Sequence, residues 1–338
     1  MRLVVDTPGH SLHVRPSGSD GPSGPCALVL CGDGLGALLA AVPALRALRG
    51  SGQRVLLAAR PELAELAALT GAVERFVPLH PGRPLTLAGG PPDLAVNLRD
   101  ADPGTHRMLL DLRPADLWGH RSGGTDGFTG PEWDEDVADD ALRWCRLLEW
   151  YGVAADPGNI ALPIPLCRNQ AKGAVVVHPG QGGRFRHSAY SAHAAHSGRS
   201  GRSAHHGDRG RRPEHRFALV ADVVAGKGGQ VVVTGGRSDR LVATRVAAQS
   251  FLPPHAVLTG RTSMRQLCAV VAGARLVVCG SAGIARLAEA YGTPCLRVDD
   301  PATSVDGVLE AALTLLAGHE STRAGYGTLS AVRQRRWR

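Results

Sequence analysis

The sequence has 338 residues, of which 43 are glycine and 23 proline; 43% are hydrophobic, only 4% are aromatic, and the formal net charge is +8. Glycine does not recur at every third position, the seven cysteines are sparse in so long a chain, and apolar residues are plentiful. A collagen-like chain, a disulfide scaffold and a disordered chain are therefore excluded. The length predicts two ordinary domains. An odd number of cysteines without a C-x-x-C pair indicates reduced thiols in a cytoplasmic protein.

The positive charge is concentrated in two segments. Residues 184–216 carry a net charge of +6 and residues 320–338 a net charge of +4, which leaves −2 for the rest of the chain. Few aromatic residues lie between these arginines to stack on bases, so we expect no nucleic-acid partner. The N-terminus lacks the apolar core of a signal peptide and no window reaches 18 apolar residues, which predicts a soluble intracellular protein.

In the first half of the chain, short apolar runs alternate with amphipathic stretches rich in Ala and Leu. This alternation predicts βα units on a parallel sheet. The predicted strands are residues 27–31, 54–59, 75–79, 93–98 and 115–118. The predicted helices are residues 37–49, 61–69, 105–112 and 136–151.

A proline-containing stretch without period, residues 157–170, predicts an interdomain connection, after which the alternation restarts. The predicted strands are residues 174–178, 230–234, 256–258, 275–279 and 295–298. The predicted helices are residues 213–226, 239–249, 263–272, 283–291 and 304–316.

The domain organisation follows from these elements and from one segment that has no apolar period. Residues 184–210 are rich in Ser, His, Arg and Gly, so we expect a disordered insert without a metal site. The predicted parts are a flexible N-terminus 1–25, a first domain 26–160, a linker 161–172, a second domain 173–318 that contains the insert, and a basic tail 319–338.

The first predicted strand leads into a glycine-rich turn. Gly32, Gly34 and Ala37 match G-x-G-x-x-A, which predicts either a dinucleotide at the helix N-terminus or only close packing of the helix on the sheet. The second strand ends at Arg60 rather than at an acid, which would suit a 2′-phosphate. Asp33 is a candidate general base or a cap of the following helix.

Three more glycine turns follow buried strands in the second half, at residues 178–183, 234–236 and 280–283. The carboxyl ends of parallel strands form the crevice in which open α/β sheets bind nucleotides. The recurrence of these turns predicts a phosphorylated ligand in the second domain.

Several stretches resemble glycosyltransferase family 9, the ADP-heptose:lipopolysaccharide heptosyltransferase type. They are PALRALR, VVVHPG, the run RRPEHRFALVADVVAGKGGQVVVTGG and, most specifically, residues 258–294. The resemblance extends from Cys26 to about Pro294. It implies an α/β fold of the GT-B type, in which two Rossmann-like αβα domains face a cleft, with the acceptor on the first and a nucleotide-sugar donor on the second.

In that scheme the glycine turns and their neighbours approach the donor, and helix N–H groups with basic side chains carry the phosphate charge, so no metal or further cofactor is implied. The predicted catalytic base is Asp33, and the predicted phosphate-neutralising residues are Arg184 and Arg211. The predicted donor-binding residues are Gly180, Gly235, Gly236, Asp239, Thr259, Gly260, Thr262, Ser281, Gly283 and Arg286.

The chain departs from the family pattern at functional positions. Ala37 stands where the family has its catalytic aspartate, while Ser281 and Arg286 stand where it has an acid and a histidine in D-T-G-x-x-H. Three functions stay open: an inverting glycosyltransferase, a catalytically impaired member that binds a nucleotide or partner, and an NADP-dependent oxidoreductase.

The acceptor of a transferred sugar is not fixed by the sequence. A glycan, a lipid or a small molecule of the cell envelope or of secondary metabolism would serve, with peripheral contact to the inner face of the membrane. The composition, rich in Ala, Arg and Gly, resembles that of high-GC actinobacterial proteins. Such organisms generally lack lipopolysaccharide, which argues against that acceptor.

Overall fold

The computed structural model describes residues 4–5, 24–121, 128–180, 214–298 and 304–317. These residues form two compact units, which we call unit 1 (described residues up to Pro163) and unit 2 (described residues from Ile164). The boundary falls within the predicted linker 161–172. The predicted insert and tail, with Arg184 and Arg211, lie outside the described residues.

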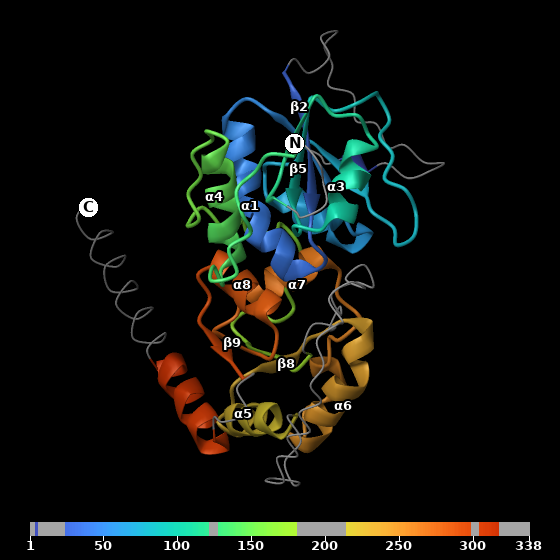
Figure 1. Ribbon diagram of the computed structural model, residues 1–338. Coiled ribbons are helices and arrows are strands. Elements are labelled where there is room, and N and C mark those ends of the chain that lie inside the picture. The colour runs from blue at the N-terminus through green and yellow to red at the C-terminus, as the bar shows by residue number, and fades with distance from the viewer. Residues whose placement is uncertain (1–3, 6–23, 122–127, 181–213, 299–303, 318–338) are drawn as a thin grey trace, which may run out of the picture. The chain divides into compact units, whose positions relative to one another are not determined.

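Unit 1 is built on a parallel sheet of six strands in the order β1-β4-β3-β2-β5-β6 (Figure 1). The strands are β1 (Val4–Val5), β2 (Cys26–Cys31), β3 (Arg54–Ala59), β4 (Arg75–Pro78), β5 (Leu94–Leu98) and β6 (Asp116–Trp118). The helices are α1 (Leu35–Gly50), α2 (Ala64–Leu69, preceded by a 3₁₀ turn at Pro61–Leu63), α3 (Pro103–Leu110) and α4 (Asp140–Trp150).

The centre of this sheet is apolar on both faces. Every residue of β5 is buried, as are all but the first residues of β2 and β3. Helices α1 and α4 lie side by side against one face, and α3 lies on the other (Figure 1). Burial on both faces is what near-continuous apolar strands require, and it makes this unit a three-layer α/β sandwich.

Unit 2 has a parallel sheet of four strands in the order β10-β9-β7-β8. The strands are β7 (Val175–His178), β8 (Val231–Val233), β9 (Leu276–Cys279) and β10 (Cys295–Arg297). The helices are α5 (Glu214–Gly226), α6 (Arg240–Gln249, preceded by a 3₁₀ turn at Arg237–Asp239), α7 (Met264–Ala272), α8 (Ala282–Ala290) and a last helix at residues 305–317.

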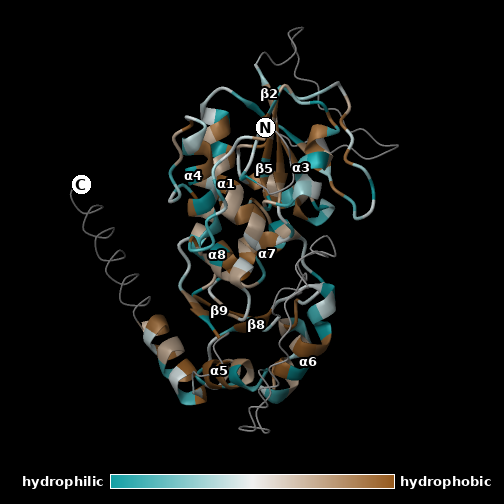
Figure 2. Ribbon diagram, viewed as in Figure 1, coloured by the Kyte–Doolittle hydropathy of each residue, from teal (hydrophilic) through white to brown (hydrophobic). Residues whose placement is uncertain are grey.

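The central strands of both sheets are mostly hydrophobic, whereas the helices mix hydrophobic and hydrophilic residues (Figure 2). In unit 2, valines of β7, β8 and β9 form one core with α5, α6 and the last helix. Within the described residues, every helix is too short or too polar to cross a membrane.

Three expectations from the sequence are wrong. Val4–Val5 pair with β4 as an edge strand, although this part was expected to be flexible. Residues 256–258 form no strand, because Pro253 and Pro254 start a 3₁₀ turn and leave only a bridge between Val233 and Val257. The helix predicted from residue 136 begins at Asp140, because the carboxylate of Asp139 accepts from the Ala141 amide as its N-cap.

Candidate functional site

In unit 1, the turn between β2 and α1 brings its backbone close to the helix. Gly34 is the N-cap of α1, with a φ of 94° that a side chain would oppose. A Cβ atom placed on Gly32 would lie 3.1 Å from Cβ of Ala37. Close packing therefore accounts for the G-x-G-x-x-A spacing.

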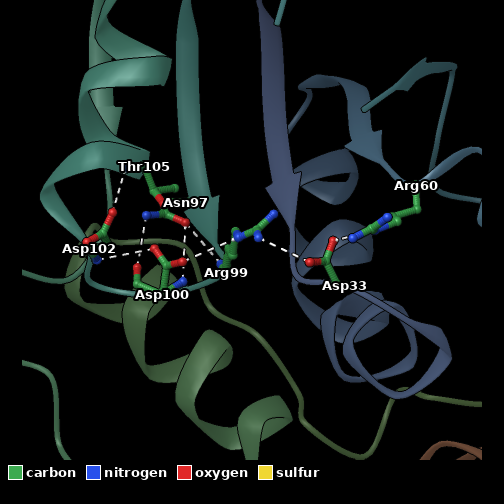
Figure 3. A network of polar contacts seen from close by, with 7 residues as sticks. All are labelled: Asp33, Arg60, Asn97, Arg99, Asp100, Asp102 and Thr105. Carbon is green, nitrogen blue, oxygen red and sulfur yellow. Dashed lines mark hydrogen bonds and ion pairs between the residues drawn. The ribbon is translucent and has the colours of Figure 1, made fainter. Parts of the chain in front are cut away.

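Asp33 lies in this turn and is held by two arginines. Its Oδ1 accepts from Nε of Arg60 at 3.0 Å and its Oδ2 from Nη2 of Arg99 at 3.1 Å (Figure 3). The alternative role as helix cap is wrong, since no side chain caps α1. Arg60 follows β3, β2 leads to Asp33, and Arg99 follows β5, so the adjacency of these three strands brings the charges together.

The turn after β5 is organised by a buried amide. The Oδ1 atom of Asn97 accepts from the Arg99 N–H at 3.0 Å, and its Nδ2 donates to the Asp100 carbonyl at 2.9 Å. Asn97 is fully buried, so the bonds to this turn satisfy a side chain that would otherwise be costly to bury. The Asp100 carboxylate forms an ion pair with Nε of Arg99 at 3.4 Å and accepts from the Asp102 N–H at 3.2 Å (Figure 3).

The sequence analysis singled out Asp33 and Arg60 at this edge but not Asn97, Arg99 or Asp100. A signal was available, because the segment NLRD follows an apolar strand directly. Two of the four charged residues that these ion pairs join, Asp33 and Arg60, were thus found from the sequence, and the other two also follow a buried strand.

In unit 2, three adjacent parallel strands end in glycine turns at the same edge of the sheet. Strand β7 leads to Gly180, β8 to Gly235 and Gly236, and β9 to Gly280. A Cβ atom placed on Gly180 would lie 2.5 Å from Cγ of Asp239, and one on Gly235 would lie 3.0 Å from Cβ of Asp239. The structure therefore brings these predicted donor residues into one cluster.

Asp239 has a structural task within this cluster. Its Oδ2 accepts from the Gly236 N–H at 2.8 Å, which closes the turn before α6. Glycine at 180 and 235 leaves the space that the carboxylate fills.

The segment after the bridge at Val257 lies beside the same turn. The hydroxyl of buried Thr259 donates to the carbonyl of Val233 at 3.3 Å. The Gly260 N–H donates to the carbonyl of Gly235 at 3.0 Å. Thr262 is partly exposed a few residues on. Thr259 and Gly260, two of the predicted donor-binding residues, are thus fixed to the end of β8.

The N-terminus of α8 lacks a side-chain cap. Its N-cap Ser281 is buried and makes no capping bond, and the first turn contains no acid. Side chains do cap α3, α4 and α7. Uncapped N–H groups and the helix dipole favour an anion. Gly283 lies in this first turn and Arg286 one turn further, both partly buried.

A buried histidine links the ends of β7 and β8. Nδ1 of His178 lies 3.0 Å from the hydroxyl oxygen of Thr234. Burial lowers the pKa of His178 from 6.5 to about 4, against a smaller opposite effect of Asp239. At neutral pH, His178 is therefore uncharged, and its contact with Thr234 links the ends of β7 and β8 where the glycine turns begin.

Comparison with known proteins shows which family this part of the chain resembles. Residues 203–298 match the family model for glycosyltransferase family 9 (heptosyltransferase). This range contains β8, β9 and β10 with the turns at Gly235–Gly236 and Gly280, but neither β7 nor Gly180. No curated protein sequence matches the chain. The resemblance to family 9 noted in the sequence is confirmed over this range.

Solved structures show the same fold. The E. coli ADP-heptose lipopolysaccharide heptosyltransferase II has a TM-score of 0.62 at 15% identity, covering 87% of this chain and 99% of its own. A family 9 glycosyltransferase from Veillonella parvula has a TM-score of 0.61 at 19% identity, covering 80% and 79%. The E. coli heptosyltransferase WaaC has a TM-score of 0.53 at 15% identity, covering 80% and 87%.

These likenesses confirm the predicted α/β fold of the GT-B type with two Rossmann-like units. They give no support to the NADP-dependent oxidoreductase. In unit 1, Arg60 donates to Asp33, so the residue expected to suit a 2′-phosphate is instead part of an ion-pair network.

Proposed function

We propose that this chain is a glycosyltransferase of the family 9 type, which moves a sugar from a nucleotide-diphosphate sugar to an acceptor hydroxyl with inversion at the anomeric carbon. One observation carries the proposal: the family match covers the part of unit 2 in which glycine turns and the uncapped N-terminus of α8 lie at one sheet edge. WaaC, solved with ADP-2-deoxy-2-fluoro heptose, supports a nucleotide-sugar donor of this class.

The donor side relies on backbone groups. Gly180 and Gly235 make room for the Asp239 carboxylate, which closes the turn before α6 by accepting from the Gly236 N–H, and the N–H groups at the start of α8, which no side chain caps, hold the diphosphate. As the bond from the anomeric carbon to the diphosphate oxygen breaks, negative charge grows on that oxygen. The dipole of α8 and the guanidinium of Arg286 stabilise this charge, so the leaving group requires no metal.

The acceptor side relies on Asp33. The acceptor oxygen attacks the anomeric carbon while its proton passes to the Asp33 carboxylate. Arg60 and Arg99 each occupy one lone pair of this carboxylate, and about two remain for the acceptor hydroxyl. The ion pairs fix the orientation of the base, because they hold both oxygens from neighbouring strands.

A second candidate function is a catalytically impaired family member that binds the nucleotide only. It is favoured by two observations: Ala37 occupies the usual position of the catalytic aspartate, and Asp33 is already ion-paired through both oxygens. The two candidates agree on the nucleotide site in unit 2 and differ in whether sugar is transferred.

The test measures both properties on the purified chain. Thermal shift with ADP, UDP, GDP and dTDP reports nucleotide binding, and release of nucleoside diphosphate from the matching sugars reports turnover. We expect Asp33→Asn to lower turnover by about 10²–10⁴-fold and to leave the nucleotide-induced shift unchanged. Asp111→Asn, an exposed carboxylate at the end of α3 away from this network, is the matched carboxylate control.

Turnover that is equal in Asp33→Asn and the parent would remove Asp33 from catalysis. Nucleotide binding without any turnover would favour the impaired member, and the absence of both would refute the proposal. The acceptor class, a glycan, lipid or small molecule presented at the inner face of the membrane, is part of the proposal and is tested by the products formed from each.

A further inference from the structure

The aromatic residues of this chain are few and unevenly placed. Of its five tryptophans, four lie between residues 118 and 150 in unit 1. Trp133 and Trp144 pack around buried His120, and the guanidinium of Arg143 lies 4.0 Å from the ring centre of Trp133. Packing of this inner group explains their presence.

A second group of rings has no such explanation. The rings of Trp118 and Tyr151 are stacked, with centroids 4.7 Å apart and planes within 5°. The ring of Trp150 meets Tyr151 edge-on, with centroids 4.6 Å apart at 78°. Trp150 is 51% exposed, and the other two are partly exposed. We call these three residues the aromatic platform.

Polar bonds hold the platform in place. Nε1 of Trp118 donates to Oδ2 of Asp116 at 2.8 Å. The Tyr151 hydroxyl accepts from the Gly119 N–H at 3.3 Å and lies within donating distance of the carbonyls of Gly119 and Thr129. Rings fixed before binding lose little conformational freedom when a ligand stacks on them.

The surroundings of the platform define the ligand chemistry. Asp116, Arg146 and Glu149 are exposed beside it, and Arg146 lies one helical turn before Trp150 on α4. A sugar ring offers C–H groups on its faces, which stack on aromatic rings, and hydroxyls at its rim, which bond to carboxylates and guanidinium groups. A purely apolar partner would bury the charges of Arg146 and Glu149 without giving them hydrogen-bond partners.

We propose that Trp118, Trp150 and Tyr151 form a saccharide-binding surface of unit 1, which holds a sugar ring of the acceptor away from the reacting hydroxyl. The inference rests on the proposed function only for the expectation that the acceptor contains sugar. It requires no contact with the donor turns of unit 2.

Ligand-observed NMR on the full chain tests this surface with three probes: maltotriose, α-1,6-mannotriose and triacetylchitotriose. We expect saturable binding of at least one probe, weakened about fivefold by Trp150→Ala and less by Trp150→Phe. Phe251→Ala is the matched control, because Phe251 is an aromatic residue of unit 2 that is 89% exposed. Thermal melting shows that each variant is folded.

Failure to bind any of the three probes would overturn the proposal, as would equal loss of binding in Phe251→Ala. A chain that dimerises through Trp150, seen as a change in sedimentation for Trp150→Ala without saccharide binding, would make the platform a subunit interface instead. Nucleotide-induced thermal shift is recorded alongside. Saccharide binding without nucleotide binding would refute the proposed function and leave this inference standing.

Discussion

The carboxyl edges of the two sheets are built in opposite ways. In unit 1, side chains dominate: Asp33 is clamped between Arg60 and Arg99, and buried Asn97 shapes the turn that carries Arg99. In unit 2, the backbone dominates: β7, β8 and β9 each lead into a glycine turn at one edge of the sheet. Side chains can exchange protons, whereas bare N–H groups hold phosphates, so the difference matches an acceptor edge and a donor edge.

The two edges should also respond differently to substitutions. A site made of close backbone approach is sensitive to added volume, because a new Cβ atom overlaps its neighbours. A site made of ion pairs is sensitive to loss of charge and of geometry, because the partly exposed partner that remains has lost a counter-charge. Lowering the pH should reduce the stability of both units, because each contains a buried histidine, and this is expected to be the largest effect.

Lowering the pH should destabilise both units, and unit 1 further through His106, whose pKa is also lowered by burial. Burial lowers the pKa of His120 in unit 1, aided by Arg143 and His106, and that of His178 in unit 2, each from 6.5 to about 4. Above pH 6.5 both residues are neutral whether folded or unfolded. Between pH 6.5 and 4 the unfolded chain binds protons that the folded chain excludes, so stability falls by about 3 kcal/mol per histidine.

Tryptophan fluorescence follows the unfolding of unit 1, and hydrogen exchange follows both units. His120→Phe should reduce the acid sensitivity of unit 1, in which buried His106 remains, and should leave that of unit 2 unchanged. If unit 1 of His120→Phe loses stability between pH 6.5 and 4 as steeply as the parent, His120 does not cause the loss.

Adding one methyl group at Gly180 should damage the donor edge most. Its Cβ would lie 2.5 Å from Cγ of Asp239, so Gly180→Ala is expected to lower the stability of unit 2 by about 2–3 kcal/mol and to abolish the nucleotide-induced thermal shift. Hydrogen exchange of β7 and β8 locates the effect. In the double variant Gly180→Ala/Asp239→Ala the added methyl group has room, so the stability of unit 2 should recover in part. If the double variant loses as much stability as the two single variants added together, the overlap with Asp239 is not the cause.

Removing Arg99 should affect the acceptor edge more mildly. Arg99→Ala leaves Asp33 with Arg60 and frees Asp100, and we expect a loss of about 1–2 kcal/mol in unit 1 because the pairs are partly exposed. Arg99→Lys keeps the charge but not the paired geometry, so turnover should stay low while stability recovers. Full turnover in Arg99→Lys would show that charge alone suffices.

The two edges also differ in how far the sequence could predict them. The donor cluster was foreseeable, because Gly180, Gly235 and Gly280 each follow a strong apolar strand and parallel strands end at one edge. The clamp on Asp33 was not, because Arg60 and Arg99 are far apart in the chain and meet only through the order β3-β2-β5. Long-range pairing of side chains depends on strand order, which local patterns do not encode.

The smallest expected effect concerns a helix end in unit 2. Phe251, two residues after the last residue of α6, has a φ of 51°, and the Leu252 N–H donates to the Ala247 carbonyl. The same bond pattern ends α1 in unit 1, where Gly52 occupies the left-handed position. A bulky residue is strained there, and 89% of the Phe251 side chain is exposed, so little packing offsets the strain.

Phe251→Gly should therefore stabilise unit 2 by about 0.5–1 kcal/mol, which corresponds to a rise in Tm of roughly 2–3 °C for a unit of this size. Phe251→Ala keeps the strained backbone without the aromatic ring, so it separates conformational relief from loss of an exposed apolar surface. If Phe251→Ala raises Tm as much as Phe251→Gly, removal of the ring rather than relief of the backbone is responsible. A fall in Tm for Phe251→Gly would mean that the greater flexibility of glycine in the unfolded chain outweighs the strain that it removes.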